Sequence, residues 1–449
     1  MKIKFFKKLI FMGVITLVFI FIRANLKQDL NKPNIILITV DALRSDHLSC
    51  YGYSRGTSHN IDELAQEGVM FTQAVSTASW TPPSICSILT GKYPYAFGLF
   101  EVSKDWGSIS ADSIASLPKI LKDNGYKTCL ISSHYGLNKL NGLKRNFDKF
   151  NCWITGRDEN ISSAVIEWLK ENRNKPFFIW VHYMGPHAPY LPPFPYDTLY
   201  LEEDSYTNKH LSTENSPVSA AFERVAEIEY QFSQYDGEIA NTDEQLGILL
   251  KNIYKLNLSK KTLIILTADH GESLDEHNCY FNHGCNLYDS ILRVPLIMVY
   301  RGLIPAGKII ESQVSLIDIM PTILEVLKIK ISSPIDGISI LPLILDIRKK
   351  NNNRYTFSER FFQKERQVAV RTTAWKLIYN LHSNKYELYD LRADPKENNN
   401  VILIEQEKSR ELKNKLDDYL REIPAFAVRK NKSMDEETKI MLESLGYLQ

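Results

Sequence analysis

The stretch Asn34-Ile-Ile-Leu-Ile-Thr-Val-Asp41 is an almost continuous apolar run that ends at a carboxylate. Runs of this kind are typical of strands that are buried on both faces, as in a parallel sheet. Similar runs recur at residues 128–131, 177–181, 263–268 and 295–300. Helical patterns separate these runs, and strands that alternate with helices indicate an α/β domain. We therefore expect a mostly parallel sheet that is flanked by helices.

Helices are expected around this sheet because apolar residues recur at helical spacing. They cover residues 61–66, 117–124, 158–172 and 219–254, the last as one long helix or as two with a break at Gly237. Near residue 350 the chain changes character, and short strand-like runs precede a charged helix at residues 405–421. These runs predict a smaller C-terminal subdomain with a small antiparallel sheet. The expected division is a segment at residues 1–26, an α/β domain at 33–348 and the subdomain at 349–449.

The composition of the 449-residue chain excludes several classes of protein. Hydrophobic residues make up 44% and charged residues 24%, which are ordinary globular values and not those of a disordered, collagen-like or polytopic membrane chain. The formal net charge of +1 gives no basic surface for a nucleic acid partner. Six cysteines are too few for disulfides to build a fold of this length.

The N-terminal segment combines a positive start with an apolar run. Four lysines precede the run at residues 9–22, which would span about 21 Å as a helix. A bilayer core is about 30 Å thick, so the run is short for a membrane span, although its length suits a secretory signal. A small-residue cleavage site is missing around Ala24, which favours an uncleaved anchor over a cleaved signal, with a buried helix as the third alternative. Anchor and signal both place the rest of the chain outside the cytoplasm.

Two strands of the predicted sheet end directly at polar side chains. Asp41 follows the first strand, and Asp269 and His270 follow the strand at residues 263–268. In open α/β sheets the functional crevice lies outside the carboxyl ends of the strands. Carboxylate oxygens and an imidazole nitrogen suit a hard or borderline divalent metal. A lone Asp after a strand is more often a turn or a helix cap, but two such sites favour a metal centre.

Thr81 stands at the predicted start of a short helix that ends at Gly91. Pro82 and Pro83 fit the first helical turn. The helix dipole favours negative charge at this end, so a hydroxyl there ionises more easily and an anionic substrate is easier to hold. The alternative is that Thr81 simply caps the helix.

Six segments, in order along the chain, resemble the sulfatase family of the alkaline phosphatase superfamily. They are the opening from Asn34 to Tyr53, the nucleophile signature Thr81-x-Pro83-Ser84-x-x-x-x-Leu89-Thr90-Gly91, the substrate loop Pro186-His187-Ala-Pro-Tyr190, the helix motif Tyr235-Asp-Gly-Glu-Ile, the metal segment Thr267-Ala-Asp269-His270-Gly271-Glu272 with His283-Gly284, and the ending Glu387-Leu-Tyr-Asp-Leu-Arg-Ala-Asp394-Pro395. The resemblance implies an alkaline-phosphatase-like fold with one bound metal ion and a nucleophile on a helix tip. It implies that Asp41, Thr81, Asp269 and His270 hold this metal.

The chain departs from the family at the nucleophile. Typical sulfatases have a Cys or Ser that is oxidised to formylglycine, within a Cys-x-Pro-x-Arg core. Here these positions are Thr81 and Ile85, and the branched Cβ of threonine cannot give the aldehyde. A threonine ester must then be hydrolysed, or its group must pass to an acceptor. Calcium-bound sulfatases often carry a second Asp beside the first, where this chain has Ala42, so Mn²⁺ or Zn²⁺ is favoured and Ca²⁺ is the alternative.

His187 and His283 are the candidates to bind the ester oxygens or to protonate the leaving group, because histidine titrates near neutral pH. The alternative is that either is structural. His134 matches another family histidine, but Ser132 stands where the family's lysine is expected, so no role is assigned to it.

Three functions remain open. The first is a metal-dependent hydrolase of sulfate or phosphate esters, on a glycan or a lipid, with Thr81 as nucleophile. The second is a transferase of phosphoethanolamine or phosphoglycerol type, although such enzymes usually have several membrane spans. The third is a non-catalytic protein that kept the fold. The first is favoured, on an extracytoplasmic protein that the N-terminal segment anchors to the membrane.

Overall fold

A large mixed sheet forms the centre of the molecule. The computed structural model describes residues 32–97, 115–152, 157–201, 217–347, 354–362 and 365–423. Within these ranges the large sheet has the strand order β4-β3-β5-β1-β6-β7-β2-β8, and β9 pairs with β2. Its strands are β1 (Asn34–Val40), β2 (Val69–Val75), β3 (Lys127–Ser132), β4 (Lys149–Cys152), β5 (Phe177–Tyr183), β6 (Thr262–Ala268), β7 (Arg293–Val299), β8 (Lys308–Ile310) and β9 (Val314–Ser315).

The central strand β1 runs parallel to β5 on one side and to β6 on the other. In the register of these pairs Val40 lies beside Tyr183 and Ala268, so the three strands end level with one another. The side chains that follow them therefore meet at one edge of the sheet. Only β7, among the described strands of this sheet, runs antiparallel to its neighbours, β6 and β2. The predicted fold class, a mostly parallel sheet with flanking helices, is confirmed.

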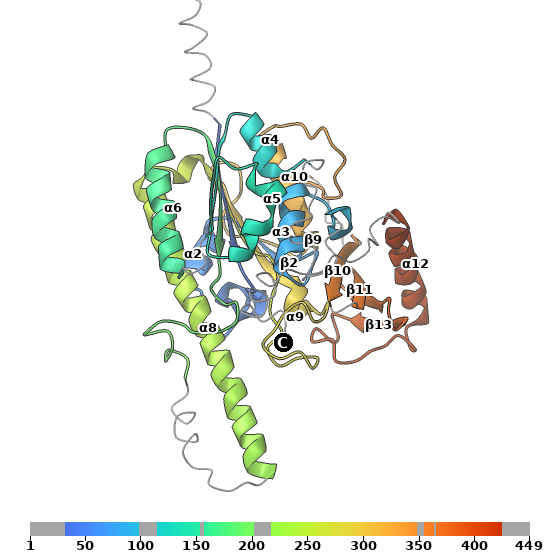
Figure 1. Ribbon diagram of the computed structural model, residues 1–449. Coiled ribbons are helices and arrows are strands. Elements are labelled where there is room, and N and C mark those ends of the chain that lie inside the picture. The colour runs from blue at the N-terminus through green and yellow to red at the C-terminus, as the bar shows by residue number, and fades with distance from the viewer. Residues whose placement is uncertain are drawn as a thin grey trace, which may run out of the picture.

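Helices cover both faces of this sheet (Figure 1). One face carries α2 (His59–Glu67), α6 (Asp158–Asn172) and α8 (Pro217–Lys255), and the other carries α3 (Thr81–Thr90), α4 (Leu117–Asp123), α5 (Asn141–Lys144) and α10 (Ile319–Val326). The short helices α9 (Asp289–Leu292) and α11 (Leu341–Ile344) lie in later loops. The apolar strands pack between these layers, and β1 is buried along its whole length.

The long helix α8 is continuous through Gly237, so the alternative of two helices is wrong. A Cβ at Gly237 would lie 2.4 Å from the carbonyl oxygen of Tyr196, in the loop after β5. The glycine is therefore needed for close packing of that loop and does not mark a helix end.

The smaller sheet of the C-terminal part is antiparallel, as predicted. It contains β10 (Thr356–Phe362), β11 (Glu365–Arg371), β12 (Trp375–Asn380) and β13 (Lys385–Asp390), and α12 (Gln406–Glu422) packs on it. Leu412 and Leu416 of α12 share a buried cluster with strand residues and with Tyr93 and Ile317 from the first part of the chain. The two parts therefore share hydrophobic packing.

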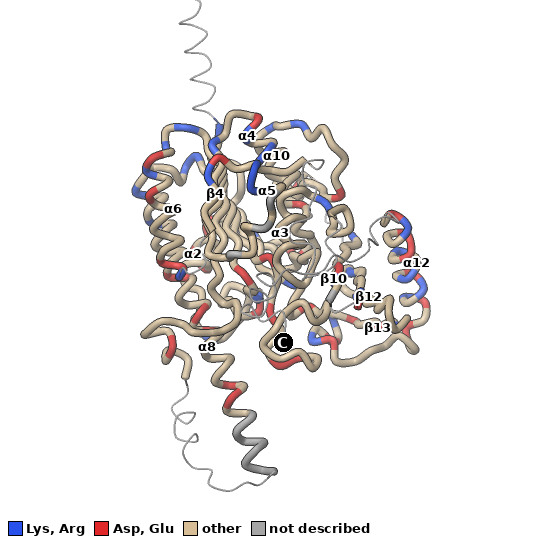
Figure 2. Tube along the Cα trace, viewed as in Figure 1, with Lys and Arg blue, Asp and Glu red and all other residues tan. Residues whose placement is uncertain are grey.

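The surface has no single dominant charge, in keeping with the net charge of +1. Figure 2 shows basic and acidic residues interspersed along α6 and α12. Across the described ranges, no helix combines the length and apolar character that a membrane crossing requires. The predicted N-terminal anchor lies outside these ranges.

Candidate metal centre and active site

The ends of β1 and β6 bring two carboxylates together at the edge of the sheet. Asp41 and Asp269 follow these strands directly, and both are fully buried. Asp269 Oδ1 accepts hydrogen bonds from the backbone N–H of His270 at 2.9 Å and of Ala42 at 3.4 Å. Ala42 has a left-handed φ of 56°, a rare conformation for alanine, and Tyr235 of α8 donates its hydroxyl to the Ala42 carbonyl at 2.7 Å. The turn after β1 is therefore held in a strained shape that aims one N–H at Asp269.

Thr81 is the first residue of α3 and is fully buried beside these carboxylates. Its Oγ1 lies 3.4 Å from Asp41 Oδ2 and 3.2 Å from His270 Nε2. The hydroxyls of Ser76 and Ser84 both donate to the Asp269 carbonyl at 2.6 Å, which ties the start of α3 to the end of β6. The Thr81 hydroxyl thus sits at the positive end of the helix dipole.

His270 is arranged as a neutral imidazole with a free lone pair. Its Nδ1 lies 2.8 Å from the Gly271 carbonyl, to which an N–H donates, so Nε2 carries the lone pair. This Nε2 lies 3.5 Å from Asp41 Oδ1 and 3.5 Å from Asp269 Oδ2. Burial, with the nearby His283, lowers the pKa of His270 well below its usual range, so the ring stays neutral.

The spacing of these donor atoms fits a divalent cation. Thr81 Oγ1 lies 3.4 Å from one oxygen of Asp41 and 3.2 Å from His270 Nε2, and this nitrogen lies 3.5 Å from one oxygen of each carboxylate. Donors about 2.0–2.1 Å from a tetrahedral metal are about 3.3 Å from one another. Asp41 Oδ1 and Asp269 Oδ2 are buried without a hydrogen-bond partner among the described residues. Burial and the charge of Asp41 raise the pKa of Asp269 well above its usual range. A cation between the two carboxylates would remove this repulsion.

His187 and His283 lie on the other side of His270. The ring centroids are 4.4 Å apart for His270 and His283, and 4.8 Å apart for His187 and His283. Both side chains are buried, and His187 comes from the loop after β5. The structure therefore brings all the predicted site residues, from four separate segments, into one cluster.

The carboxyl group of Glu272 forms a hydrogen bond with the ring of His283. His283 Nδ1 lies 3.1 Å from Glu272 Oε1. Burial raises the pKa of Glu272 to about 8 and lowers the pKa of His283 to about 3. Near neutral pH the shared proton therefore resides on Glu272, which donates it to Nδ1, and His283 keeps its own proton on Nε2.

A disulfide between Cys279 and Cys285 closes a short loop around His283. The expectation that disulfides do not build the fold holds for the domain, since this bridge spans six positions in sequence. It is nevertheless a local feature that the cysteine count did not predict. Closing so short a loop removes conformational freedom from the unfolded chain that is worth about 2 kcal/mol.

Two buried histidines that were not assigned a role also face Asp41. His182 Nε2 lies 3.3 Å from Asp41 Oδ2, and His134 Nε2 lies 3.8 Å from the same oxygen. Burial alone would raise the pKa of Asp41, but His187 helps to hold it well below its usual range. The predicted strand at residues 177–181 ends just before His182, whereas β5 extends through this residue to Tyr183. Its position one residue before the end of β5 was the signal that could have revealed it.

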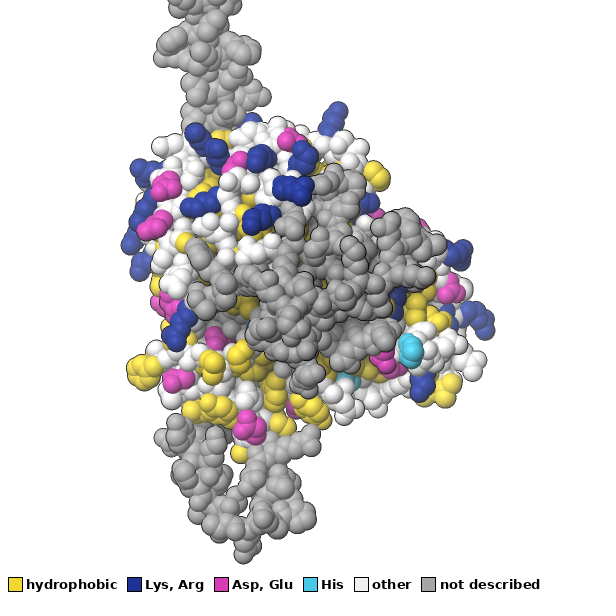
Figure 3. Space-filling view, viewed as in Figure 1, with side chains coloured by type: hydrophobic (Ala, Val, Ile, Leu, Met, Phe, Trp, Pro, Cys, Tyr) yellow, Lys and Arg dark blue, Asp and Glu magenta, His cyan; other side chains and the backbone are white. Residues whose placement is uncertain are grey.

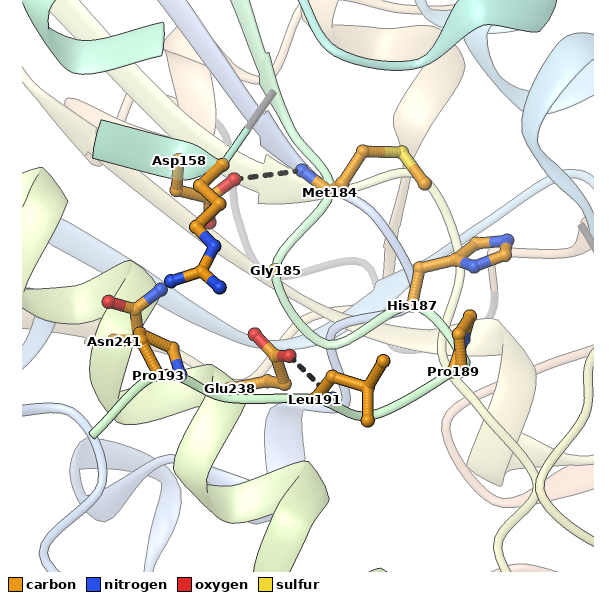
Figure 4. A pocket seen from close by; sticks show the side chains of 10 residues that line it. Asp158, Met184, Gly185, His187, Pro189, Leu191, Pro193, Glu238 and Asn241 are labelled. Atoms are coloured by element: carbon orange, nitrogen blue, oxygen red, sulfur yellow. Dashed lines mark hydrogen bonds between the residues drawn. The ribbon is translucent and has the colours of Figure 1, made fainter. Parts of the chain in front are cut away.

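The loop that carries His187 is fastened by two carboxylates of the surrounding helices (Figure 4). Asp158 Oδ1 accepts from the backbone N–H of Met184 at 3.3 Å, and Glu238 Oε1 accepts from that of Leu191 at 2.9 Å. A cavity of about 170 Å³ lies between them. Figure 4 shows the His187 ring pointing away from Glu238, so the cavity lies behind the loop.

Exposed apolar side chains continue this loop outward. Leu191 and Phe194 are 73% and 82% exposed, and Leu199 follows them. Figure 3 shows hydrophobic side chains gathered on the side of the molecule where α8 leaves the body.

Arg44 forms ion pairs with Asp46 at 2.9 Å and with Glu276 at 2.8 Å. These ion pairs hold the segments that surround the site in place.

Comparison with known proteins identifies the family. The Sulfatase family model matches residues 33–329, and the model of the C-terminal part of N-sulphoglucosamine sulphohydrolase matches residues 276–425. The chain is 25% identical to N-acetylglucosamine-6-O-sulfatase of Bacteroides thetaiotaomicron over 472 aligned residues, which cover 84% of each protein.

Solved structures agree at the level of the fold. One is a complex with its substrate D-glucosamine-2-N,6-O-disulfate, with a TM-score of 0.71 and 22% identity over 89% of this chain and 100% of the other. Another is phosphonate monoester hydrolase of Agrobacterium radiobacter, with a TM-score of 0.69 and 20% identity over 88% of this chain and 96% of the other. The chain therefore belongs to the sulfatase family, and it is a sulfatase-like ester hydrolase with an alkaline-phosphatase-like fold.

Proposed function

We propose that the chain hydrolyses sulfate or phosphate esters in a metal-dependent reaction in which the Thr81 hydroxyl is the nucleophile. The observation that carries this proposal is the burial of Thr81 Oγ1 at the tip of α3, 3.4 Å from Asp41 and 3.2 Å from His270. Ile85 stands where formylglycine-forming sulfatases have arginine, and Cys86 is buried in the helix.

The residues that would hold the metal are Asp41, Thr81, Asp269 and His270. When bound, a divalent ion supplies a Lewis acid that lowers the pKa of the Thr81 hydroxyl and polarises an ester oxygen. The mixed oxygen and nitrogen donors favour Mn²⁺ or Zn²⁺ over Ca²⁺. Neutral His270, with its lone pair on Nε2, is already in the form that a metal ligand requires.

The remaining steps belong to residues of the chain. The ionised Thr81 hydroxyl gives its proton to solvent water, and Thr81 Oγ1 bonds to the sulfur or phosphorus as the bond to the leaving oxygen breaks. That oxygen takes the proton from His283 Nε2, which Glu272 replenishes through Nδ1. His187 holds a non-bridging ester oxygen. Water then attacks the same sulfur or phosphorus and returns one proton to the His283–Glu272 pair. The bond to Thr81 Oγ1 breaks, this oxygen regains a proton from solvent water, and the sulfate or phosphate leaves.

The substrate class that we favour is a sulfated sugar. Relatives at 25% identity or below are named for glucosamine sulfates, and these support a glycan ester as the natural substrate. The resemblance to phosphonate monoester hydrolase keeps phosphate and phosphonate esters as alternatives. One alternative function is a transferase, which would use the same residues to pass the group on Thr81 to an alcohol. The other is a non-catalytic protein, which would not require these side chains to be arranged around Thr81.

We place the reaction outside the cytoplasm, with the N-terminal segment as the anchor. The Cys279–Cys285 disulfide supports this location, because disulfides persist in oxidising compartments. Thiol trapping in intact cells tests it, since both cysteines should resist alkylation until a reductant is added.

The decisive experiment is mass spectrometry of the Thr81 peptide after the full chain has met a nitrophenyl sulfate or phosphate ester. We expect a mass increase of one sulfate or phosphate on Thr81, and Thr81→Ala should lose turnover by at least about 10³-fold while keeping its metal. Cys86→Ala is the matched control in the same helix and should turn over like the wild type. An unmodified Thr81 with unchanged turnover in Thr81→Ala, or formylglycine at Cys86, would overturn the proposal.

A further inference from the structure

His182 lies close to Asp41 of the candidate metal centre and near Asp269. Its side chain is fully buried at the end of β5. Asp41, His182 and Asp269 each offer one donor atom, and these three atoms all lie within 4.8 Å of one another. No role follows for His182 from the family motifs quoted above.

A chain of buried hydrogen bonds fixes the orientation of the His182 ring. The parallel register of β1 and β5 sets Thr39 beside His182, and Thr39 Oγ1 lies 2.7 Å from His182 Nδ1. Trp180 Nε1–H donates to the same oxygen at 2.8 Å, and the Thr39 hydroxyl donates to the Val181 carbonyl at 3.5 Å. With the Thr39 hydroxyl turned toward Val181, its oxygen accepts from both Trp180 and His182; in this arrangement the ring proton lies on Nδ1 and Nε2 carries a lone pair.

In this arrangement the lone pair on His182 Nε2 faces Asp41 Oδ2 with no proton between them. A charge-assisted hydrogen bond from a protonated His182 would bring Nε2 to about 2.7–2.9 Å from Asp41 Oδ2. The observed separation is 3.3 Å, and Nε2 has no hydrogen-bond partner among the described residues. Two donors at this separation are instead typical of atoms that share one cation.

We infer that His182 is a further nitrogen ligand of the metal that Asp41, Asp269 and His270 hold, and that Thr39 and Trp180 set the ring in its ligating form. The inference rests on the metal centre of the proposed function. It gives the ion one imidazole from β5 and one from the loop directly after β6, whereas Ala42, next to Asp41, offers no side-chain ligand. Two imidazole nitrogens select a borderline transition metal and disfavour Ca²⁺, which prefers oxygen donors.

The direct test counts ligating imidazoles in the full chain loaded with Co²⁺. Each histidine that ligates paramagnetic Co²⁺ through Nε2 gives one strongly shifted, exchangeable Nδ1–H signal in the proton NMR spectrum. We expect two such signals from the wild type, for His182 and His270, and one from His182→Gln. The loss of this ligand, or of its support in Thr39→Val, should weaken Co²⁺ binding by about 10–100-fold.

His134→Gln is the matched control, because His134 is equally buried but its Nε2 lies 3.8 Å from Asp41. It should keep both signals. Thr39→Val retains every proposed ligand, so it tests the orientation of His182 even where His182→Gln does not fold. The assignment of His182 as a ligand would be overturned by one shifted signal in the wild type or by two in His182→Gln. It would also be overturned if His134→Gln weakened Co²⁺ binding as much as His182→Gln does. None of these results would affect the rest of the proposed function. A wild-type chain that binds no Co²⁺ would overturn the proposed function with it.

Discussion

At the scale of single residues, threonine at position 81 decides what the rest of the site must supply. A protonated hydroxyl is a weak nucleophile, and a threonine ester cannot shed its group by collapsing to an aldehyde. The site therefore needs a group that ionises Thr81 and a proton for the leaving oxygen. Asp41 and His270, which lie within 3.4 Å of Thr81 Oγ1, would hold the metal that performs the first task, and the pair of His283 and Glu272 suits the second.

Replacing His283 by glutamine is expected to slow turnover most for esters with basic leaving groups. Positioned proton transfer contributes about 10²–10⁴-fold, so a sugar or alkyl ester should lose kcat/KM on this order. A nitrophenyl ester, whose leaving group needs no proton, should lose less than about tenfold. The measurement is kcat/KM for a series of esters against the pKa of the leaving alcohol. His277→Gln, in the same loop, is the control and should leave the slope unchanged, whereas an equal loss for all esters in His283→Gln would remove His283 as proton donor.

The site was predictable where a residue directly follows a strand. Asp41, Asp269 and His270 were found because the apolar runs before them are unbroken and their carboxyl ends meet at one sheet edge. His182 was not predicted as a site residue, because its environment depends on the pairing of β5 with β1, which places His182 beside Thr39. No local pattern encodes which strands become neighbours.

At the scale of elements, the strands that sequence reasoning missed are those with polar residues inside them. The register of β2 shifts between Phe71 and Ala74, so its apolar pattern is interrupted by Thr72 and Gln73. The strand β10 contains Glu359, whose carboxylate accepts from Tyr419 of α12, a partner that only the tertiary fold provides. Strands β1, β5 and β6 were found because both of their faces are buried.

The hydrogen bond from the His187 loop to Glu238 of α8 makes the stability of the folded chain depend on pH. Burial raises the pKa of Glu238 from 4.5 to about 8. The folded chain thus keeps a proton that the unfolded chain releases above about pH 4.5, so this stabilisation is complete at acid pH and declines as the pH rises through about 8.

Glu238→Gln should remove this pH dependence while keeping an acceptor for the Leu191 N–H. The free energy of unfolding of the wild type, measured relative to the variant, is expected to fall by roughly 4 kcal/mol at most between pH 5 and pH 9. Denaturant unfolding at pH 5, 7 and 9 measures the difference. Glu244→Gln, an exposed change on the same helix, is the control. A difference that stays constant, or that grows with pH, contradicts a buried protonated Glu238.

At the scale of the whole molecule, the C-terminal sheet braces the loops that form the active site. The backbone N–H of Glu359 donates to the Thr77 carbonyl at 2.9 Å, shortly before Thr81, and Arg360 Nε donates to the Gly284 carbonyl at 2.7 Å, next to His283. Lys376 is fully buried and pairs with Glu397 at 2.8 Å and with Asp289, which lies in the first part of the chain. A boundary near residue 350 therefore separates the two sheets in sequence, but hydrogen bonds and ion pairs connect the two parts of the chain.

We predict that the two sheets unfold together. Removing the chain after residue 347 would expose the cluster around Tyr93 and Ile317 and leave Asp289 buried without Lys376, and an unpaired buried charge is strongly destabilising. Calorimetry of the full chain should therefore give one unfolding transition, and the truncated chain should give none and bind no metal. A chain that ends at residue 423 keeps both sheets and is the control. Two separate transitions, with wild-type metal content in the chain cut after residue 347, would instead show that the α/β domain builds its site alone.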